Sequence, residues 1–376
     1  MSKRRKIYNM VKFNKVLRDI KIYEAGKPIE LVVREFGIAP EDVVKLASNE
    51  NPIGTSPLVT EAIKAHASKA HLYPDDSMFE LKAALSSKFD VEDENIIIGA
   101  GSDQVLEFIS RAVLDENSSV LMSAVTFAMY EIYAKQMGAK VLRTASYQHK
   151  YDEFMEAFEM RKPKIVYLCT PNNPTGDATP KAEVLKLIEA MQKDAIVVVD
   201  GAYMEYAAAK DEAYAIVPQD ILPYENVIYL GTFSKAYGLG GMRVGYGVAQ
   251  KSLIDQLNKM RPPFNISSLS LVSAIAVCKD ENFVKKSISL HQEEIKRYEA
   301  FAKENGLAFI ESYTNFITYL FDETLNSSEI ADALLKRGVI IRDLSSYGMN
   351  AIRITVGTQK QNNIFFQNFK TVVGLK

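Results

Sequence analysis

The chain has 376 residues, enough to bury a large core and usually to form two domains. Its formal net charge of −2 gives no electrostatic reason to expect binding to nucleic acid or to an anionic membrane. The two cysteines and four histidines show no disulfide framework and no metal-ligand spacing, and no apolar run is long enough to cross a bilayer. We therefore expect no metal site, small-molecule partners and a cytoplasmic location.

The N-terminal segment 1–13 is basic and leads into the polar stretch KVLRDIK. A secretory signal needs an apolar stretch at this point, so we expect a solvated arm, with Met1 or Met10 as the true start.

Seven short apolar segments then have the length of strands and end in polar or glycine-rich turns. Amphipathic helical patterns separate several of them, at 102–114, 127–138 and 181–193. This alternation predicts an α/β fold with a mostly parallel sheet covered by helices on both faces. The predicted strand segments are 95–102, 118–124, 140–146, 164–173, 195–203, 226–235 and 243–249.

From residue 262 the pattern changes to a long helical stretch at 267–304, followed by shorter strands and helices. These indicate a smaller α+β domain. We predict three parts: an N-terminal arm (1–44) that packs with the small domain, a large cofactor-binding domain (45–261) and a small C-terminal domain (262–376).

Polar residues gather where the predicted strands of the large sheet end. Ligands bind at this carboxyl edge in parallel sheets. The residues concerned are Ser102, Asn173, Asp200, Tyr203, Ser234 and Lys235.

Lys235 lies at a strand end before the glycine-rich turn of TFSKAYGLGGMRVGYG. Burial would favour its neutral form, a nucleophile toward an aldehyde. Thr232, Ser234 and Arg243 add hydroxyls and a guanidinium, a set suited to phosphate. A strand-end lysine before a packing turn is the structural alternative.

Two further strand ends carry candidate groups. Asp200 follows an entirely apolar strand, so its carboxylate needs a partner such as a protonated pyridine nitrogen, and Tyr203 could reach the same ring. Asn173 precedes a proline, which favours an extended backbone and lets the amide project into the site. A helix N-cap and an Asn-Pro turn are the structural alternatives.

The segment NIIIGAGSDQ places glycines between a strand and a helix that begins at Ser102 and Asp103. Backbone N–H groups at a helix start bind anions. The same glycines resemble the start of a dinucleotide fingerprint, but Gln104 occupies the third glycine position.

In this order, GAGSDQ, TFAMY, PNNPTG, DGAY and SKAYGLGGMRVGY resemble the fold-type-I aminotransferases, which use pyridoxal 5′-phosphate. YEAGKPIELVVREFG, KLASNENPIG, HLYPDD, SYTNF and the RDLSSYG…RITVGT run are similar to the histidinol-phosphate aminotransferase family. The resemblance runs from about Tyr23 to Thr358. It implies a mostly parallel large-domain sheet flanked by helices and a smaller α+β domain. Val125 stands where family members often have proline, and we expect Phe127 to keep its place.

The resemblance implies roles for the cofactor site. Lys235 would form the Schiff base and later move the proton of the amino-group transfer, while Asp200 would keep the pyridine nitrogen protonated. Asn173 and Tyr203 would bind the ring 3′-oxygen, and Phe127 would stack on the ring. The implied phosphate ligands are Ser102, Asp103, Ser234, Arg243 and, in a homodimer with shared sites, Tyr73 of the partner subunit; Thr232 joins them from its place in TFSKAYGLGGMRVGYG.

The resemblance also implies a substrate site. Arg353 would hold the substrate carboxylate, and Arg342 would be the second arginine of a pocket that accepts both glutamate and a phosphate ester. Tyr23 and Asn49 would face the substrate. The expected reaction moves the amino group between L-glutamate and imidazole-acetol phosphate, forming L-histidinol phosphate and 2-oxoglutarate in histidine biosynthesis.

Other functions remain open at this point. The same cofactor chemistry would serve an aromatic amino-acid aminotransferase or a phospho-amino-acid decarboxylase. An NAD-dependent dehydrogenase would use GAGSDQ as its phosphate loop but would leave PNNPTG without a role. A non-catalytic partner-binding protein would have no need of Lys235, Asp200 and Arg243 together.

Overall fold

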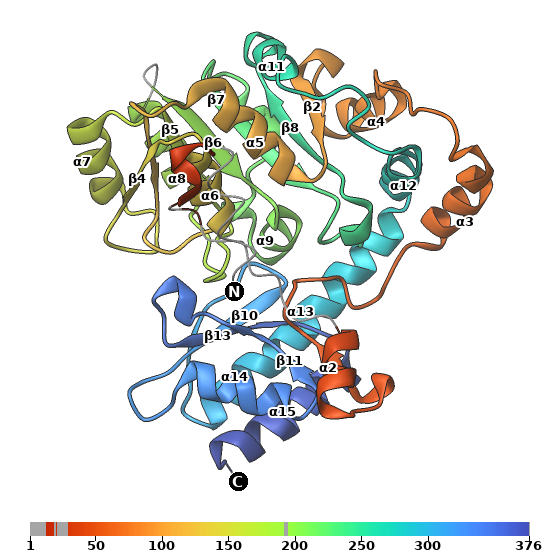
Figure 1. The fold of residues 1–376 in the computed structure, drawn as a ribbon, viewed down its shortest axis with the longest axis vertical. Helices are drawn as coiled ribbons and strands as arrows, with labels where there is room; N and C mark the ends of the chain where they lie inside the picture. Colours follow the sequence, from red (N-terminus) through yellow and green to blue (C-terminus); the bar gives the residue numbers. More distant parts are fainter. Residues whose placement is uncertain (1–12, 19, 21–28, 192–194, 376) are drawn as a thin grey trace.

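The computed structural model describes residues 13–18, 20, 29–191 and 195–375. The chain forms a large α/β part and a smaller α+β part, drawn above and below one another in Figure 1. In the described part of the chain, no helix is long and apolar enough to cross a membrane.

The large part is built on a seven-stranded sheet. Each predicted strand segment contains one of its strands, which confirms that part of the prediction. All strands are parallel except β8, which runs antiparallel to both neighbours. In spatial order they are β2 (Ile96–Gly99), β8 (Gly245–Ala249), β7 (Val227–Thr232), β6 (Ile196–Asp200), β5 (Ile165–Cys169), β3 (Ser119–Met122) and β4 (Lys140–Arg143).

Helices cover both faces of this sheet because successive strand residues point to opposite sides. Val166 and Leu168 of β5 pack in one buried cluster, whereas Ile165 and Tyr167 pack in the other. The second face is covered by α5 (Ser102–Val113), α6 (Ala128–Gln136) and α11 (Lys251–Asn258). The first is covered by α3 (Pro57–His66), α4 (Phe79–Phe89), α7 (Tyr151–Arg161), α8 (Lys181–Ala190), α9 (Met204–Lys210), α10 (Pro218–Ile221) and α12 (Ser268–Cys278).

The small part has a four-stranded antiparallel sheet in the order β12 (Arg342–Asp343), β13 (Ala351–Thr355), β10 (Phe316–Leu320) and β9 (Ala308–Ile310). Its helices are α13 (Glu281–Glu304), α14 (Ser327–Leu335) and α15 (Gln359–Val373). β1 (Val44–Lys45) pairs in parallel with β11 (Val339–Ile340), and α2 (Ile29–Phe36) packs over this pair through the cluster that contains Val32, Val43 and Ile340. Short 3₁₀ helices lie at Lys15–Arg18, Pro40–Asp42, Ala67–Lys69, Asp93–Asn95, Glu212–Tyr214, Gly240–Met242 and Ser345–Tyr347.

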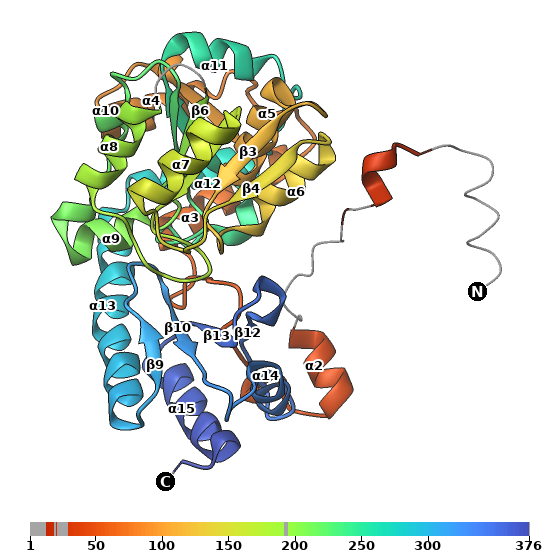
Figure 2. The same cartoon turned by 90° about the vertical axis from the view of Figure 1, so that its left-hand side faces the viewer.

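The helical stretch predicted at 267–304 is two helices, because the Asp280 side chain accepts the backbone N–H of Phe283 and starts α13 anew. Leu271 of α12 and Phe283 of α13 pack in the large-part core, whereas Tyr298 of α13 packs in the small-part core. The chain thus passes between the two cores within α13, as Figure 2 shows, although the sequence prediction assigned everything from residue 262 to the small domain.

Candidate active site

A cavity of about 270 Å³ lies where β5, β6 and β7 end, facing the small part. Their last residues, Cys169, Asp200 and Thr232, all line it, as expected for a parallel sheet. Thirteen of the predicted site residues line this cavity: Asn49, Ser102, Asp103, Phe127, Asn173, Asp200, Tyr203, Thr232, Ser234, Lys235, Arg243, Arg342 and Arg353.

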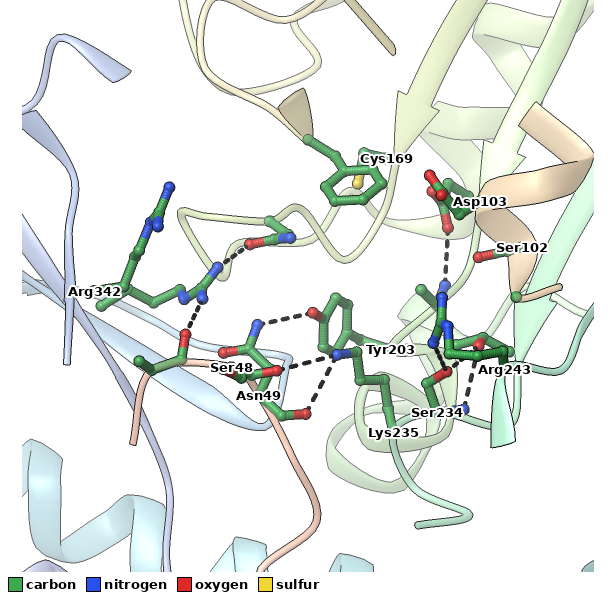
Figure 3. Close-up of a pocket in the computed structure, with 18 of the residues that line it drawn as sticks. Ser48, Asn49, Ser102, Asp103, Cys169, Tyr203, Ser234, Lys235, Arg243 and Arg342 are labelled. Atoms are coloured by element: carbon green, nitrogen blue, oxygen red, sulfur yellow. Dashed lines mark hydrogen bonds between the residues drawn. The ribbon is translucent and has the colours of Figure 1, made fainter. Parts of the chain in front are cut away.

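Lys235 follows β7 and extends toward the segment that joins β1 to α3. Its Nζ donates to the carbonyl oxygens of Ser48 at 3.4 Å and Asn49 at 3.3 Å (Figure 3). Burial, reinforced by the positive charges of Arg353 and Arg243, lowers the pKa of this amine to about 8. A much larger fraction of Lys235 is therefore neutral and nucleophilic near pH 8 than of an exposed lysine, whose pKa is about 10.4.

Asp200 ends β6 and is buried. Its Oδ1 accepts the backbone N–H of Ala202 at 3.1 Å, and its Oδ2 accepts the hydroxyl of Tyr130 at 2.6 Å. Burial raises the pKa of this carboxyl, while the two hydrogen bonds act in the opposite direction. Asp200 is thus a buried acid whose charge would be stabilised by a cation in the cavity.

Three hydrogen bonds place further polar groups at the cavity. The Asn49 side-chain amide donates to the Tyr203 hydroxyl at 2.8 Å. Arg353 Nη1 donates to Asn173 Oδ1 at 2.5 Å, and its Nη2 donates to the Ala47 carbonyl at 2.7 Å (Figure 3). The small part and the large part therefore meet through side chains that line the same space.

One end of the cavity has the donor set of an anion site. The N-terminus of the twelve-residue helix α5 opens onto it at Ser102. Arg243 lies opposite and donates to Ser234 Oγ at 3.3 Å, and Thr232 Oγ1 donates to the same Ser234 oxygen at 3.1 Å. Gly101 has φ of +79°, and a Cβ there would come within 2.9 Å of Arg243 Nη2, so glycine keeps this end open.

The other end carries two arginines on neighbouring strands. Arg342 of β12 and Arg353 of β13 are direct cross-strand partners in the antiparallel register, and both line the cavity. Two guanidinium groups on neighbouring strands at one end of the cavity suit a ligand that carries anionic groups.

Of the predicted site residues that the structure describes, Tyr73 alone does not line the cavity in this chain. Tyr73 is 83% exposed and stacks on Phe264 with ring centroids 4.7 Å apart. Tyr23 lies outside the described residues.

The sequence prediction missed six residues that line the cavity: Ala47, Ser48, Gly101, Cys169, Ala202 and Tyr347. Ser48, Gly101 and Ala202 are each adjacent in sequence to a predicted residue. Tyr347 lies within the RDLSSYG segment, so this motif carried the signal that could have found it.

Residues 41–369 match the family model described as aminotransferase class I and II. The chain belongs to this aminotransferase family. The histidinol-phosphate aminotransferase of Sulfurovum sp. is 75% identical over 96% of this chain and 100% of the relative. That of Sulfurimonas denitrificans is 57% identical over 95% of this chain and 98% of the relative.

Among solved structures, a histidinol-phosphate aminotransferase from Sinorhizobium meliloti in complex with pyridoxal-5′-phosphate is similar to this aminotransferase. Its TM-score is 0.87 and its sequence identity 25%, over 96% of this chain and 98% of that one. The predicted family and fold are confirmed. The family match sets aside the dehydrogenase interpretation of GAGSDQ.

Proposed function

We propose that this aminotransferase moves the amino group between L-glutamate and imidazole-acetol phosphate, forming L-histidinol phosphate and 2-oxoglutarate in histidine biosynthesis. The observation that carries the proposal is one cavity lined by Lys235, Asp200 and the cross-strand arginines Arg342 and Arg353. The relative from Sulfurovum sp., 75% identical over nearly the whole chain, supports the same reaction.

The residues at the cavity suit pyridoxal 5′-phosphate. The cradle at the start of α5, with Thr232, Ser234 and Arg243, offers hydroxyls, backbone N–H groups and a guanidinium for a phosphate. Asp200 offers a buried carboxylate for a protonated ring nitrogen. When bound, the cofactor supplies an electron sink that stabilises negative charge at the substrate α-carbon.

Lys235 is the group that we assign to the cofactor aldehyde and to proton transfer. Its neutral amine would hold the cofactor through the aldehyde, and the same amine would accept and return a proton at the substrate α-carbon. The carbonyls of Ser48 and Asn49 orient the Lys235 amine toward the cavity.

The remaining residues that we assign to the ring surround the space between Lys235 and Asp200. Asn173 and the Tyr203 hydroxyl would bind the ring 3′-oxygen, and Phe127, at the N-cap of α6, would cover one ring face. Asp103, in the first turn of α5, would contribute its backbone N–H to the phosphate.

The two arginines account for both halves of the reaction. Arg353 would bind the α-carboxylate of glutamate through its planar fork. Arg342 would bind the second carboxylate of glutamate in one half-reaction and the phosphate ester in the other. Asn49 holds the Tyr203 hydroxyl at the edge of this space, and Tyr23 is assigned to the substrate on the family resemblance alone.

We further propose a cytoplasmic homodimer in which Tyr73 of the partner subunit reaches the cofactor phosphate. Tyr73 and Leu72 are both largely exposed on one loop, which gives this chain an apolar surface suited to a second copy. Mixing Lys235→Ala and Tyr73→Ala subunits tests the shared site, because each mixed dimer would contain one intact site. Recovered activity supports sharing, and no recovery after verified subunit exchange would contradict it.

A substrate comparison tests the reaction itself. Histidinol phosphate, phenylalanine and phosphothreonine would be compared by kcat/KM, with decarboxylation of phosphothreonine followed separately. We expect histidinol phosphate to be the best substrate. A kcat/KM for phenylalanine about a hundredfold above that for histidinol phosphate would favour the aromatic aminotransferase instead. Release of carbon dioxide from phosphothreonine as the main reaction would favour the decarboxylase.

A further inference from the structure

Asp200 is held by two donors that carry no charge. It is only 4% exposed, and its oxygens accept the Ala202 backbone N–H at 3.1 Å and the Tyr130 hydroxyl at 2.6 Å. A buried carboxylate stays ionised only when hydrogen bonds or a cation compensate for lost hydration. The phenol of Tyr130 is therefore a large part of what stabilises the Asp200 anion.

Tyr130 is the last residue of the TFAMY segment, and the cofactor assignments leave it without a role. It is fully buried in the first turn of α6 and does not line the cavity. Its ring stacks on Tyr167 with centroids 4.3 Å apart and planes 5° apart, and it meets the edge of Phe127 at 5.5 Å. These contacts fix the ring of Tyr130. Its hydroxyl therefore reaches Asp200 from α6, outside the lining of the cavity.

The Tyr130 hydroxyl is also a permanent donor. Burial and the negative charge of Asp200 raise the pKa of Tyr130 well above its ordinary value, so this phenol keeps its proton throughout the working pH range.

We propose that Tyr130 is a positioning residue that holds Asp200 ionised and aimed into the cavity, and thereby keeps the ring nitrogen of bound pyridoxal phosphate protonated. This inference rests on the proposed function. In the enzyme with cofactor bound, Asp200 stabilised as an anion would leave the shared proton on the ring nitrogen. Without the Tyr130 hydrogen bond the carboxylate would be more basic, and the proton would shift toward Asp200.

Tyr167 provides a matched control. It is 1% exposed, belongs to the same aromatic stack, and its hydroxyl lies 3.4 Å from Ser110 Oγ instead of near Asp200. Tyr167→Phe thus removes an equally buried phenol oxygen from the same stack and leaves the Asp200 contacts intact. Both substitutions keep the ring, so packing is preserved.

The test is the ¹⁵N chemical shift of ring-labelled pyridoxal phosphate bound to the holoenzyme. The wild-type signal is expected at the protonated position, and Asp200→Asn marks the unprotonated limit. Tyr130→Phe is expected to move the signal toward that limit, while Tyr167→Phe leaves it at the wild-type position. Equal signals in Tyr130→Phe and Tyr167→Phe would overturn the inference.

The two proposals fail in different ways. A wild-type protein that binds no labelled cofactor would overturn the proposed function, whereas a normal wild-type signal that Tyr130→Phe does not move overturns only the role of Tyr130. As a second readout, Tyr130→Phe is expected to lower kcat about tenfold with little change in the KM for glutamate, because the residue does not touch substrate. A raised KM with unchanged kcat would also count against a positioning role.

Discussion

Arg353 and Asn173 are joined by a 2.5 Å hydrogen bond from the guanidinium Nη1 to the side-chain carbonyl oxygen. Arg353 belongs to β13 of the small part, and Asn173 follows β5 of the large part. The residue assigned to the substrate carboxylate is therefore in direct contact with a residue assigned to the cofactor ring. The fork of Arg353 also binds the Ala47 carbonyl, so its orientation is set from two sides.

Arg353→Lys tests this arrangement. A lysine keeps the charge but cannot hold two partners and a carboxylate in one plane. We expect the KM for glutamate to rise about tenfold or more while the cofactor stays bound. Steady-state kinetics together with the absorption of bound cofactor would check this. A KM equal to that of the wild type would show that the planar fork is not required.

Asp200→Ala should lower kcat by several orders of magnitude, because the ring nitrogen would lose the carboxylate that keeps it protonated. Single-turnover reaction with glutamate measures this step directly. Asp103→Asn is the control, since it neutralises another carboxyl that lines the cavity, whose Oδ2 accepts the hydroxyl of Tyr133 at 3.0 Å. A loss of less than about tenfold in Asp200→Ala would contradict the role of Asp200.

Arg342→Ala tests whether Arg342 binds the substrate or only supports the fold. We expect kcat/KM to fall far more for histidinol phosphate and glutamate than for phenylalanine. Equal losses on all three substrates, accompanied by lower stability in denaturant titration, would mean that Arg342 is structural.

The pKa of Lys235 predicts how the apoenzyme captures pyridoxal phosphate. Burial lowers this pKa from its ordinary value to about 8, and the neutral amine is the reactive form. The covalent capture rate should therefore rise with pH and level off above about 8, instead of rising until about pH 10 as for an exposed lysine. Stopped-flow absorption measures it, with Lys235→Ala as the control. A rate still rising steeply at pH 9.5 would contradict the buried environment.

Much of the fold follows from local patterns. Alternating apolar strands and amphipathic helices predicted the parallel sheet, and each of its seven strands falls in a predicted segment. The polar residues at strand ends converge on one cavity because parallel strands bring their carboxyl ends to the same edge.

The parts that were not predicted depend on contacts between distant segments. The Tyr130 hydroxyl reaches Asp200 from a helix on the sheet face, and no spacing in the sequence reports that contact. Ser48 lines the cavity only because the segment after β1 crosses Lys235. The helical pattern at 267–304 also gave no sign that α12 packs on α3 and α4 in the large part.

The most direct test of the account is where the cofactor attaches. Borohydride treatment of the purified holoenzyme would fix the cofactor to its lysine, and peptide mass spectrometry would locate it. We predict a phosphopyridoxyl group on the peptide that carries Lys235 and none in Lys235→Ala. Attachment at another lysine, or no attachment in protein that still transfers amino groups, would contradict the account.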